Sequence, residues 1–140
     1  MTQPLHVENA VALTDIFGYW PSFHDAEVLT LHLERADKDG PSLEARIHVF
    51  HRSDRIDERG FYIREHHTIA TLHFANIDLN DLGGFNGSNV LSEIEIEEVD
   101  PAANEGRRLG VSFASSFGES LDLRCDRISV KAVEPFVEAI

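Results

Sequence analysis

Alternation of apolar and polar side chains constrains the fold of this chain more than any other feature. In two stretches, residues 29–34 and 43–49, every second residue is apolar and the residues between them are polar. A period of two predicts strands that bury one face and expose the other. The turn-forming sequence ADKDGP lies between the two stretches. We therefore expect them to pair as an antiparallel hairpin.

Similar patterns recur at turn-separated intervals in the rest of the chain. Further strands are predicted at about residues 67–76, 90–99, 109–113 and 121–125, and residues 128–133 either continue the last strand or start another. The segment 51–66, HRSDRIDERGFYIREH, is dense in charge and is predicted to be a long exposed loop.

One helix is predicted near the start of the chain, at about residues 8–17. Ala10, Leu13 and Phe17 recur at helical spacing, and Gly18 is placed to end the helix. The complete pattern predicts a mostly β (α+β) protein with this helix in front. Its strands form an antiparallel meander of six or seven, curled or folded into two layers.

Charge and length limit the kind of protein and its partners. The 140 residues suit a single domain, residues 1–140, and carry 25 acidic residues against 12 Lys and Arg, a formal net charge of −13. Such a field repels nucleic acids and anionic membranes and favours cationic partners. Cys125 is the only cysteine, and no signal-peptide or membrane-span pattern occurs. We expect a cytoplasmic protein without a disulfide.

The dipeptide His24-Asp25 is the first candidate site. Adjacent His and Asp mark one class of metal phosphohydrolase, but that fold is helical and needs further ligands on neighbouring helices. Here the pair leads into a predicted strand, where consecutive side chains point to opposite faces. The two converge only if they lie in the turn before it. The favoured interpretation is a structural junction, with Trp20 and Phe23 buried where the helix meets the sheet.

Eight histidines raise a second metal hypothesis. His32, His48 and His73 share the outward-facing parity of their strands, so their imidazoles can cluster if those strands are neighbours. No HExxH motif, no paired cysteine and no carboxylate at ligand spacing accompanies them. A solvated sheet face with scattered histidines is favoured, and neither a metal site nor a cofactor is predicted.

A row of carboxylates is the most informative polar feature. Glu93, Glu95 and Glu97 project from one face of a predicted strand within roughly 14 Å. Their mutual repulsion is tolerable in water, and a cationic partner would relieve it. The row is either a solvated face that protects a sheet edge from aggregation, or part of a partner-binding site with the loop residues Asn86 and Asn89 beside it.

Three motif-bearing stretches occur in order along residues 16–130: IFGYWPSFHDAEV, LGGFNGSNVLSEIEI and VSFASSFGESLDLRCDRISV. Together they resemble the immunity protein 50 family of bacterial polymorphic-toxin systems. The matching positions are Trp20, Pro21, Ser22, Phe23, His24 and Asp25, then Phe85, Asn86, Asn89 and Val90, then Ser116, Phe117, Gly118, Cys125 and Ile128. The chain departs from the family pattern at Gly87-Ser88, where larger polar residues are expected.

The resemblance implies a small, largely β, cytosolic protein that binds and neutralises a cognate toxin. The leading hypothesis is thus a non-enzymatic immunity protein that occludes its toxin, and the acidity favours a basic toxin. One alternative is a small metal-dependent hydrolase that uses His24, Asp25 and the outward-facing histidines. Another is an oligomerising scaffold, a homo-oligomer whose open sheet edges pair between subunits.

Overall fold

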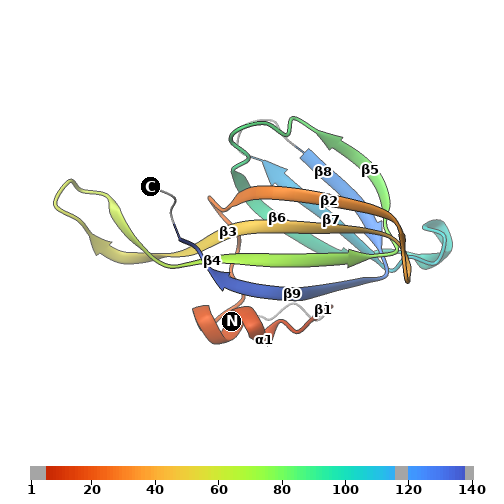
Figure 1. Cartoon of the computed structure of the whole chain (residues 1–140), viewed down its shortest axis with the longest axis horizontal. Coiled ribbons are helices and arrows are strands. Elements are labelled where there is room, and N and C mark those ends of the chain that lie inside the picture. The colour runs from red at the N-terminus through yellow and green to blue at the C-terminus, as the bar shows by residue number, and fades with distance from the viewer. Residues whose placement is uncertain (1–5, 116–119, 138–140) are drawn as a thin grey trace.

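The computed structural model describes residues 6–115 and 120–137, and these residues form two β-sheets and one short α-helix, arranged as in Figure 1. The elements are β1 (Val7–Glu8), α1 (Val11–Phe17), β2 (Glu27–Asp37), β3 (Gly40–Ile56), β4 (Tyr62–Ala75), β5 (Asp78–Gly83), β6 (Leu91–Glu98), a 3-10 turn (Pro101–Ala103), β7 (Leu109–Ser115), β8 (Ser120–Cys125) and β9 (Arg127–Pro135).

The strands divide into two open sheets. Sheet A has the order β1-β9-β4-β3-β2 and sheet B the order β5-β8-β7-β6. All pairs are antiparallel except β1 with β9. Each sheet contains a three-strand meander, β2-β3-β4 or β6-β7-β8, and β5 and β9 are the strands by which the chain changes sheet. The prediction of a mostly β, two-layered meander with one N-terminal helix is confirmed.

Two short strands escape the period-two pattern, so the described residues hold nine strands rather than six or seven. Strand β1 has two residues, and β5 has only one half-buried leucine, Leu79, among mainly polar neighbours. Because β1 pairs with β9, helix α1 begins at Val11, after the predicted start. It ends as expected at Gly18, whose φ of +80° suits glycine and whose N–H donates to Thr14 O at 2.8 Å.

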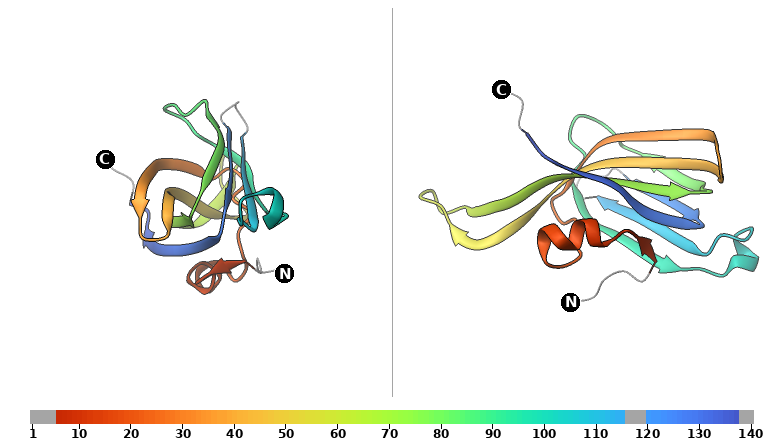
Figure 2. Two further views of the ribbon diagram at one scale, coloured as in Figure 1. Left: turned by 90° about the vertical axis from the view of Figure 1, so that its right-hand side faces the viewer. Right: turned by 60° about the horizontal axis from the view of Figure 1, so that its bottom comes forward.

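The predicted loop at residues 51–66 is wrong, because this segment is a β-hairpin. Strands β3 and β4 continue past the sandwich, with His51 opposite Glu65 and Ile56 opposite Tyr62. We call residues 50–67 the arm, and Figures 1 and 2 show it projecting away from both sheets. In the arm the two backbones pair with each other, but most side chains on both faces are exposed to solvent. Because neither face is buried, the sequence shows no alternation of apolar and polar residues there.

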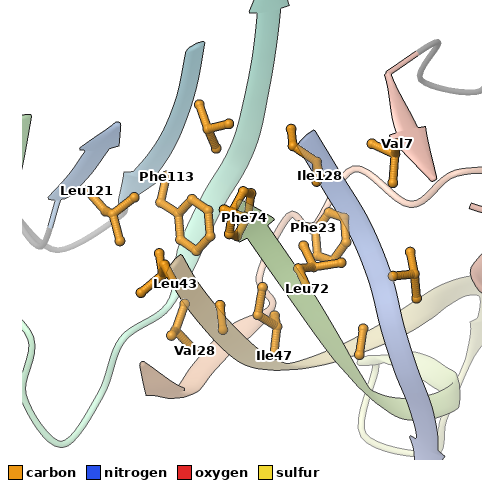
Figure 3. Close-up of a cluster of buried hydrophobic side chains, with 14 of the residues drawn as sticks. Val7, Phe23, Val28, Leu43, Ile47, Leu72, Phe74, Phe113, Leu121 and Ile128 are labelled. Carbon is orange, nitrogen blue, oxygen red and sulfur yellow. The ribbon is translucent and has the colours of Figure 1, made fainter. Parts of the chain in front are cut away.

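The core lies between the inner faces of the two sheets. The inner residues of β3, β4, β7, β8 and β9 are almost fully buried. Phe74 of β4 meets Phe113 of β7 across the interface, with ring centroids 6.0 Å apart and planes inclined by 63° (Figure 3). Such edge-to-face contacts add to the free energy gained by burying the rings. Alternation in both sheets therefore produces a single shared core.

Both passages between the sheets lie at one corner of the sandwich. The chain leaves sheet A through Asn76 and Ile77 and returns to it through Asp126. Arg107 Nε donates to Asn76 O at 2.8 Å, and Asn76 Nδ2 donates to Asp126 Oδ2 at 2.8 Å. The Asp126 N–H also donates to Ala75 O at 3.0 Å. Hydrogen bonds thus tie the two passages to each other.

Replacing Phe74 tests the contribution of the inter-sheet contact. Phe74 has no exposed surface, so Phe74→Ala should lower the free energy of unfolding by about 3–5 kcal/mol, measured by urea denaturation. Val11→Ala is the matched control, because Val11 is 54% exposed. The control should change stability by less than about 0.5 kcal/mol. Equal effects of the two substitutions would contradict a core centred on this contact.

Candidate partner-binding site

The junction loop, residues 18–26, joins α1 to β2 in an unusual backbone conformation. Phe23 and Asp25 have φ angles of +65° and +64°, in the left-handed region that non-glycine residues seldom adopt. Burial of Phe23, which is 2% exposed and contacts Trp20 with ring centroids 5.7 Å apart, helps to offset this cost. The Asp25 N–H donates to Leu91 O at 2.9 Å, which fixes the loop to β6.

His24 and Asp25 lie in this turn, before β2 begins. His24 Nδ1 is 3.1 Å from the Ser92 carbonyl oxygen and donates to it, while His24 Nε2 is 3.7 Å from Asp25 Oδ1. The two side chains therefore do converge, as the turn permits and a strand would not. Their polar atoms are used to join the loop to sheet B and to each other.

The junction loop and the base of the arm enclose a pocket of about 340 Å³. Its lining is Tyr19, Pro21, Ser22, Phe23, His24, Asp25, Phe50 and Arg52. Tyr19 Oη also hydrogen-bonds to His51 Nδ1 at the base of the arm. The loop therefore contacts sheet B on one side and the arm on the other.

The outer face of sheet B carries a concentration of carboxylates that the sequence reveals only in part. We call it the acidic face: Glu93, Glu95 and Glu97 on β6, Asp122 on β8, and Asp78 and Asp81 on β5. The registers place Glu95, Asp122 and Asp81 in one cross-strand row and Glu97 and Asp78 in the next, while Glu93 lies on the same face opposite Ala114. Between them β7 contributes only small outward residues, Gly110, Ser112 and Ala114. Asp78, Asp81 and Asp122 were missed because adjacency of their strands to β6 does not follow from local sequence.

Repulsion between carboxylates on the acidic face raises the pKa of one of them, Glu95. A hydrogen bond to Glu93, together with repulsion by its charge, raises the pKa of Glu95 above the ordinary value. Arg124 is the only Lys or Arg within the described strands of sheet B, and its Nη1 lies 3.2 Å from Asp122 Oδ1. Gly110 is covered by neighbouring side chains, since an added Cβ would lie 3.1 Å from Val99 Cγ1 and 3.4 Å from both Arg124 Nη1 and Glu97 Cγ. The acidic face therefore carries six carboxylates, and the one guanidinium in the described strands of its sheet is paired with Asp122.

The outer face of sheet A differs, because its charges are largely paired. The pairs are Arg46 with Glu134, Lys131 with Glu44, His73 with Asp37, and Arg127 with Asp39. A groove of about 360 Å³ crosses this face at the β2–β3 turn. There the Lys38 N–H, Ser42 and His73 hydrogen-bond to Asp37 and lower its pKa to about 2. Its charges are already compensated, so the groove offers less to a charged partner than the acidic face does.

The outward histidines do not gather at one point. His32 and His73 both lie in the cross-strand row of Glu44, on strands either side of it. His48 lies elsewhere: its Nε2 is 2.9 Å from His67 Nδ1, and its ring stacks on Phe136 at 3.8 Å. In the part of the chain that the structure describes, no three His, Cys, Asp or Glu side chains are placed to hold a metal ion.

Asn86 and Asn89 shape the loop that precedes β6. The Asn86 N–H donates to Asn89 Oδ1 at 2.8 Å, and Asn89 Nδ2 donates to Asn86 O at 2.6 Å. Asn89 is 4% exposed and its Nδ2 also reaches Val28 O at 3.4 Å. Asn86 lies at the surface, although its own amide bonds within the loop to Gly84 O and the Ser88 N–H.

Three further positions of the sequence pattern, Ser116, Phe117 and Gly118, lie outside the described residues. Cys125 ends β8 inside the core, where burial and the nearby Asp126 raise the pKa of its thiol to about 12. The thiol therefore stays protonated and unreactive at neutral pH. None of the helices described in the structure is long and apolar enough to span a membrane.

Comparison with known proteins gives one match. The model of the family described as Immunity protein 50 matches residues 9–136, which include the junction loop, the arm and the acidic face. No curated protein and no solved structure matches the chain.

The coupling of Glu93 to Glu95 can be tested by titration. Glu93→Gln removes a negative charge beside Glu95, so the raised pKa of Glu95 should fall toward the ordinary value for glutamate. Side-chain carboxyl NMR resonances followed against pH measure this shift. Glu58→Gln, at the exposed tip of the arm, is the control and should leave the Glu95 titration unchanged. An unaltered Glu95 pKa in Glu93→Gln would exclude the coupling.

Proposed function

The chain belongs to the immunity protein 50 family, and we propose that it neutralises a cognate toxin by binding to it and covering the surface the toxin needs. Membership of that family implies toxin neutralisation and a toxin partner. The manner of neutralisation is our proposal: stoichiometric, non-enzymatic occlusion in the cytoplasm, with the acidic face as part of the contact surface.

The single observation that carries this proposal is the charge distribution on sheet B. Six carboxylates share one exposed face with one guanidinium, and two of them, Glu93 and Glu95, interact unfavourably when both are ionised. A partner that brings Lys or Arg side chains relieves this repulsion and forms charge-assisted hydrogen bonds. Ser112 and Ala114 of β7 are small and half-buried, so they do not separate these carboxylates from a long cationic side chain above the sheet. The partner is therefore a protein domain with a basic surface.

The net charge of −13 supports the same partner. Opposite charges steer two proteins together and accelerate association, and salt weakens this effect. Glu93, Glu95 and Glu97 are the proposed direct contacts. Asn86 and Asn89 hold the adjoining loop in shape, and Asn86, at the surface, is the one of the two that a partner can reach.

Neutralising the glutamate row tests the proposal. The probe is the cognate toxin domain, to be sought among the genes next to the one for this protein, produced together with this protein and then separated from it. The triple variant Glu93→Gln, Glu95→Gln and Glu97→Gln should lower the association rate constant about tenfold or more at low salt, and should flatten its dependence on ionic strength. Surface plasmon resonance over a salt series measures both.

A charge-matched control separates the local row from net charge. Glu8→Gln, Asp15→Asn and Glu34→Gln remove the same number of negative charges from exposed positions outside the acidic face. This variant should keep most of the association rate and should still protect against the toxin. Unchanged affinity and salt dependence in the glutamate variant, or equal losses in both variants, would exclude the acidic face as the contact.

A further inference from the structure

The arm lacks the acidic excess of the rest of the chain. It holds four of the ten arginines and only four acidic residues, whereas the remaining residues carry 21 acidic side chains against eight Lys and Arg. The net charge of the rest of the chain already favours solubility, so solubility does not explain the arginines of the arm. Its arginines call for a separate physical explanation.

The arginines of the arm divide between its two faces. Arg55 forms an ion pair with Glu65 on one face. Arg52 and Arg64 lie directly opposite each other on the other face, and Arg59 is in the turn beyond them. Among the described residues none of these three forms an ion pair. Like charges placed directly across two strands destabilise the pair, so an anionic partner would remove an existing cost.

Aromatic rings accompany these guanidinium groups. The guanidinium of Arg52 lies 5.3 Å from the centre of the Tyr62 ring, and that of Arg64 lies 4.5 Å from the centre of the Phe50 ring. Phe61 is 66% exposed and Tyr62 is 53% exposed. We call these six residues the arm face: Phe50, Arg52, Arg59, Phe61, Tyr62 and Arg64. Exposed arginine and tyrosine side chains are the types most often found at the energetic centres of protein interfaces.

The arm face is hollowed and its turn is held in place. Five of its residues, with Asp57, line a depression of about 420 Å³. Asp57 Oδ1 accepts the N–H groups of Arg59 at 2.9 Å and Phe61 at 3.0 Å, so its carboxylate is engaged in the turn. A formed turn reduces the conformational entropy that binding would otherwise cost. The depression can receive a partner group without prior folding of the arm.

The arm face continues into the surface already proposed to bind the toxin. Phe50 and Arg52 also line the junction pocket, which His24 borders. His24 donates to the Ser92 carbonyl oxygen, and Ser92 precedes Glu93 of the acidic face. One surface therefore runs from the carboxylates of sheet B, across the junction loop, to the arginines of the arm.

We infer that the arm face is a second contact site for the same toxin, and that it enters a cleft lined by carboxylates and apolar groups. This inference rests on the proposed function. The partner it fits is bipolar: a basic surface meets the acidic face, and an acidic cleft beside that surface receives Arg52, Arg59 and Arg64. A nucleic acid is a poorer occupant, because the net charge of −13 repels a phosphate backbone.

The sign of one mutational effect tests the inference. Arg52→Gln with Arg64→Gln removes two positive charges from the arm face. If the arm meets an acidic cleft, the dissociation constant for the cognate toxin domain should rise about tenfold or more. If the arm only faces a basic surface, removing like charge should strengthen binding instead. Phe61→Ala with Tyr62→Ala should also weaken binding at least tenfold, mainly through faster dissociation.

Arg55→Gln is the matched control, because Arg55 lies on the same arm with its charge already paired to Glu65. It should change the dissociation constant less than threefold. Thermal unfolding of every variant confirms that the fold is retained, which is expected because the core cluster includes no residue of the arm. Equal losses in the control and the arm-face variants would overturn the inference.

The remaining outcomes separate this inference from the proposed function. A toxin domain that does not bind the unmodified protein overturns both. A domain that binds, and binds less well to the glutamate variant, but binds the Arg52/Arg64 variant equally or more tightly, overturns only the inference. Light scattering of the free protein at low salt tests a second copy as occupant. If the free protein is a dimer, and the Arg52/Arg64 substitutions abolish that dimer but leave toxin binding unchanged, the inference is also overturned.

Discussion

The hydrogen-bonded corner at Arg107 is the constraint on which the two-sheet arrangement depends. The chain passes between the sheets twice, and both passages lie side by side, joined by Asn76, Asp126 and the guanidinium of Arg107. Fixing both passages at one end sets the inner faces of sheets A and B against each other, so that Phe74 meets Phe113. The same constraint turns the carboxylates of sheet B outward. Strand β4 starts in the arm and ends at this corner, which places the arm at the opposite end of the molecule (Figure 1).

Period-two alternation predicted the parts of the fold that touch the core. It located six strands, the β2–β3 hairpin and the apolar stretch at residues 128–133, because each of these segments buries one face and the burial selects apolar residues. It could not locate β1, which has two residues, or the outer halves of β3 and β4, which bury little. It also left open whether residues after Cys125 continue a strand or begin one. The structure begins a new strand in the other sheet, a choice made by the distant contacts of Asp126.

The candidate site was predictable only where neighbouring residues in sequence are also neighbours in space. The row of Glu93, Glu95 and Glu97 follows directly from strand geometry. Its extension to Asp78, Asp81 and Asp122 depends on the order of four strands, which local patterns do not contain. Likewise, the segment of the arm was recognised as charged and exposed. Its division into a paired face and an unpaired face required the register of β3 on β4.

Because no side chain of the arm belongs to the core cluster, and contacts of the arm with the body such as Tyr19 with His51 lie at its base, the tip of the arm is coupled to the body mainly through the backbone. Amino-acid exchanges at its tip therefore leave the free energy of folding almost untouched, while exchanges at Leu72 or Phe74 do not. The residues proposed for recognition and the residues of the core thus occupy separate positions along the same two strands. A chain built in this way can change the surface that it offers to a partner at the hairpin tip, one substitution at a time, while the sandwich beneath keeps its stability.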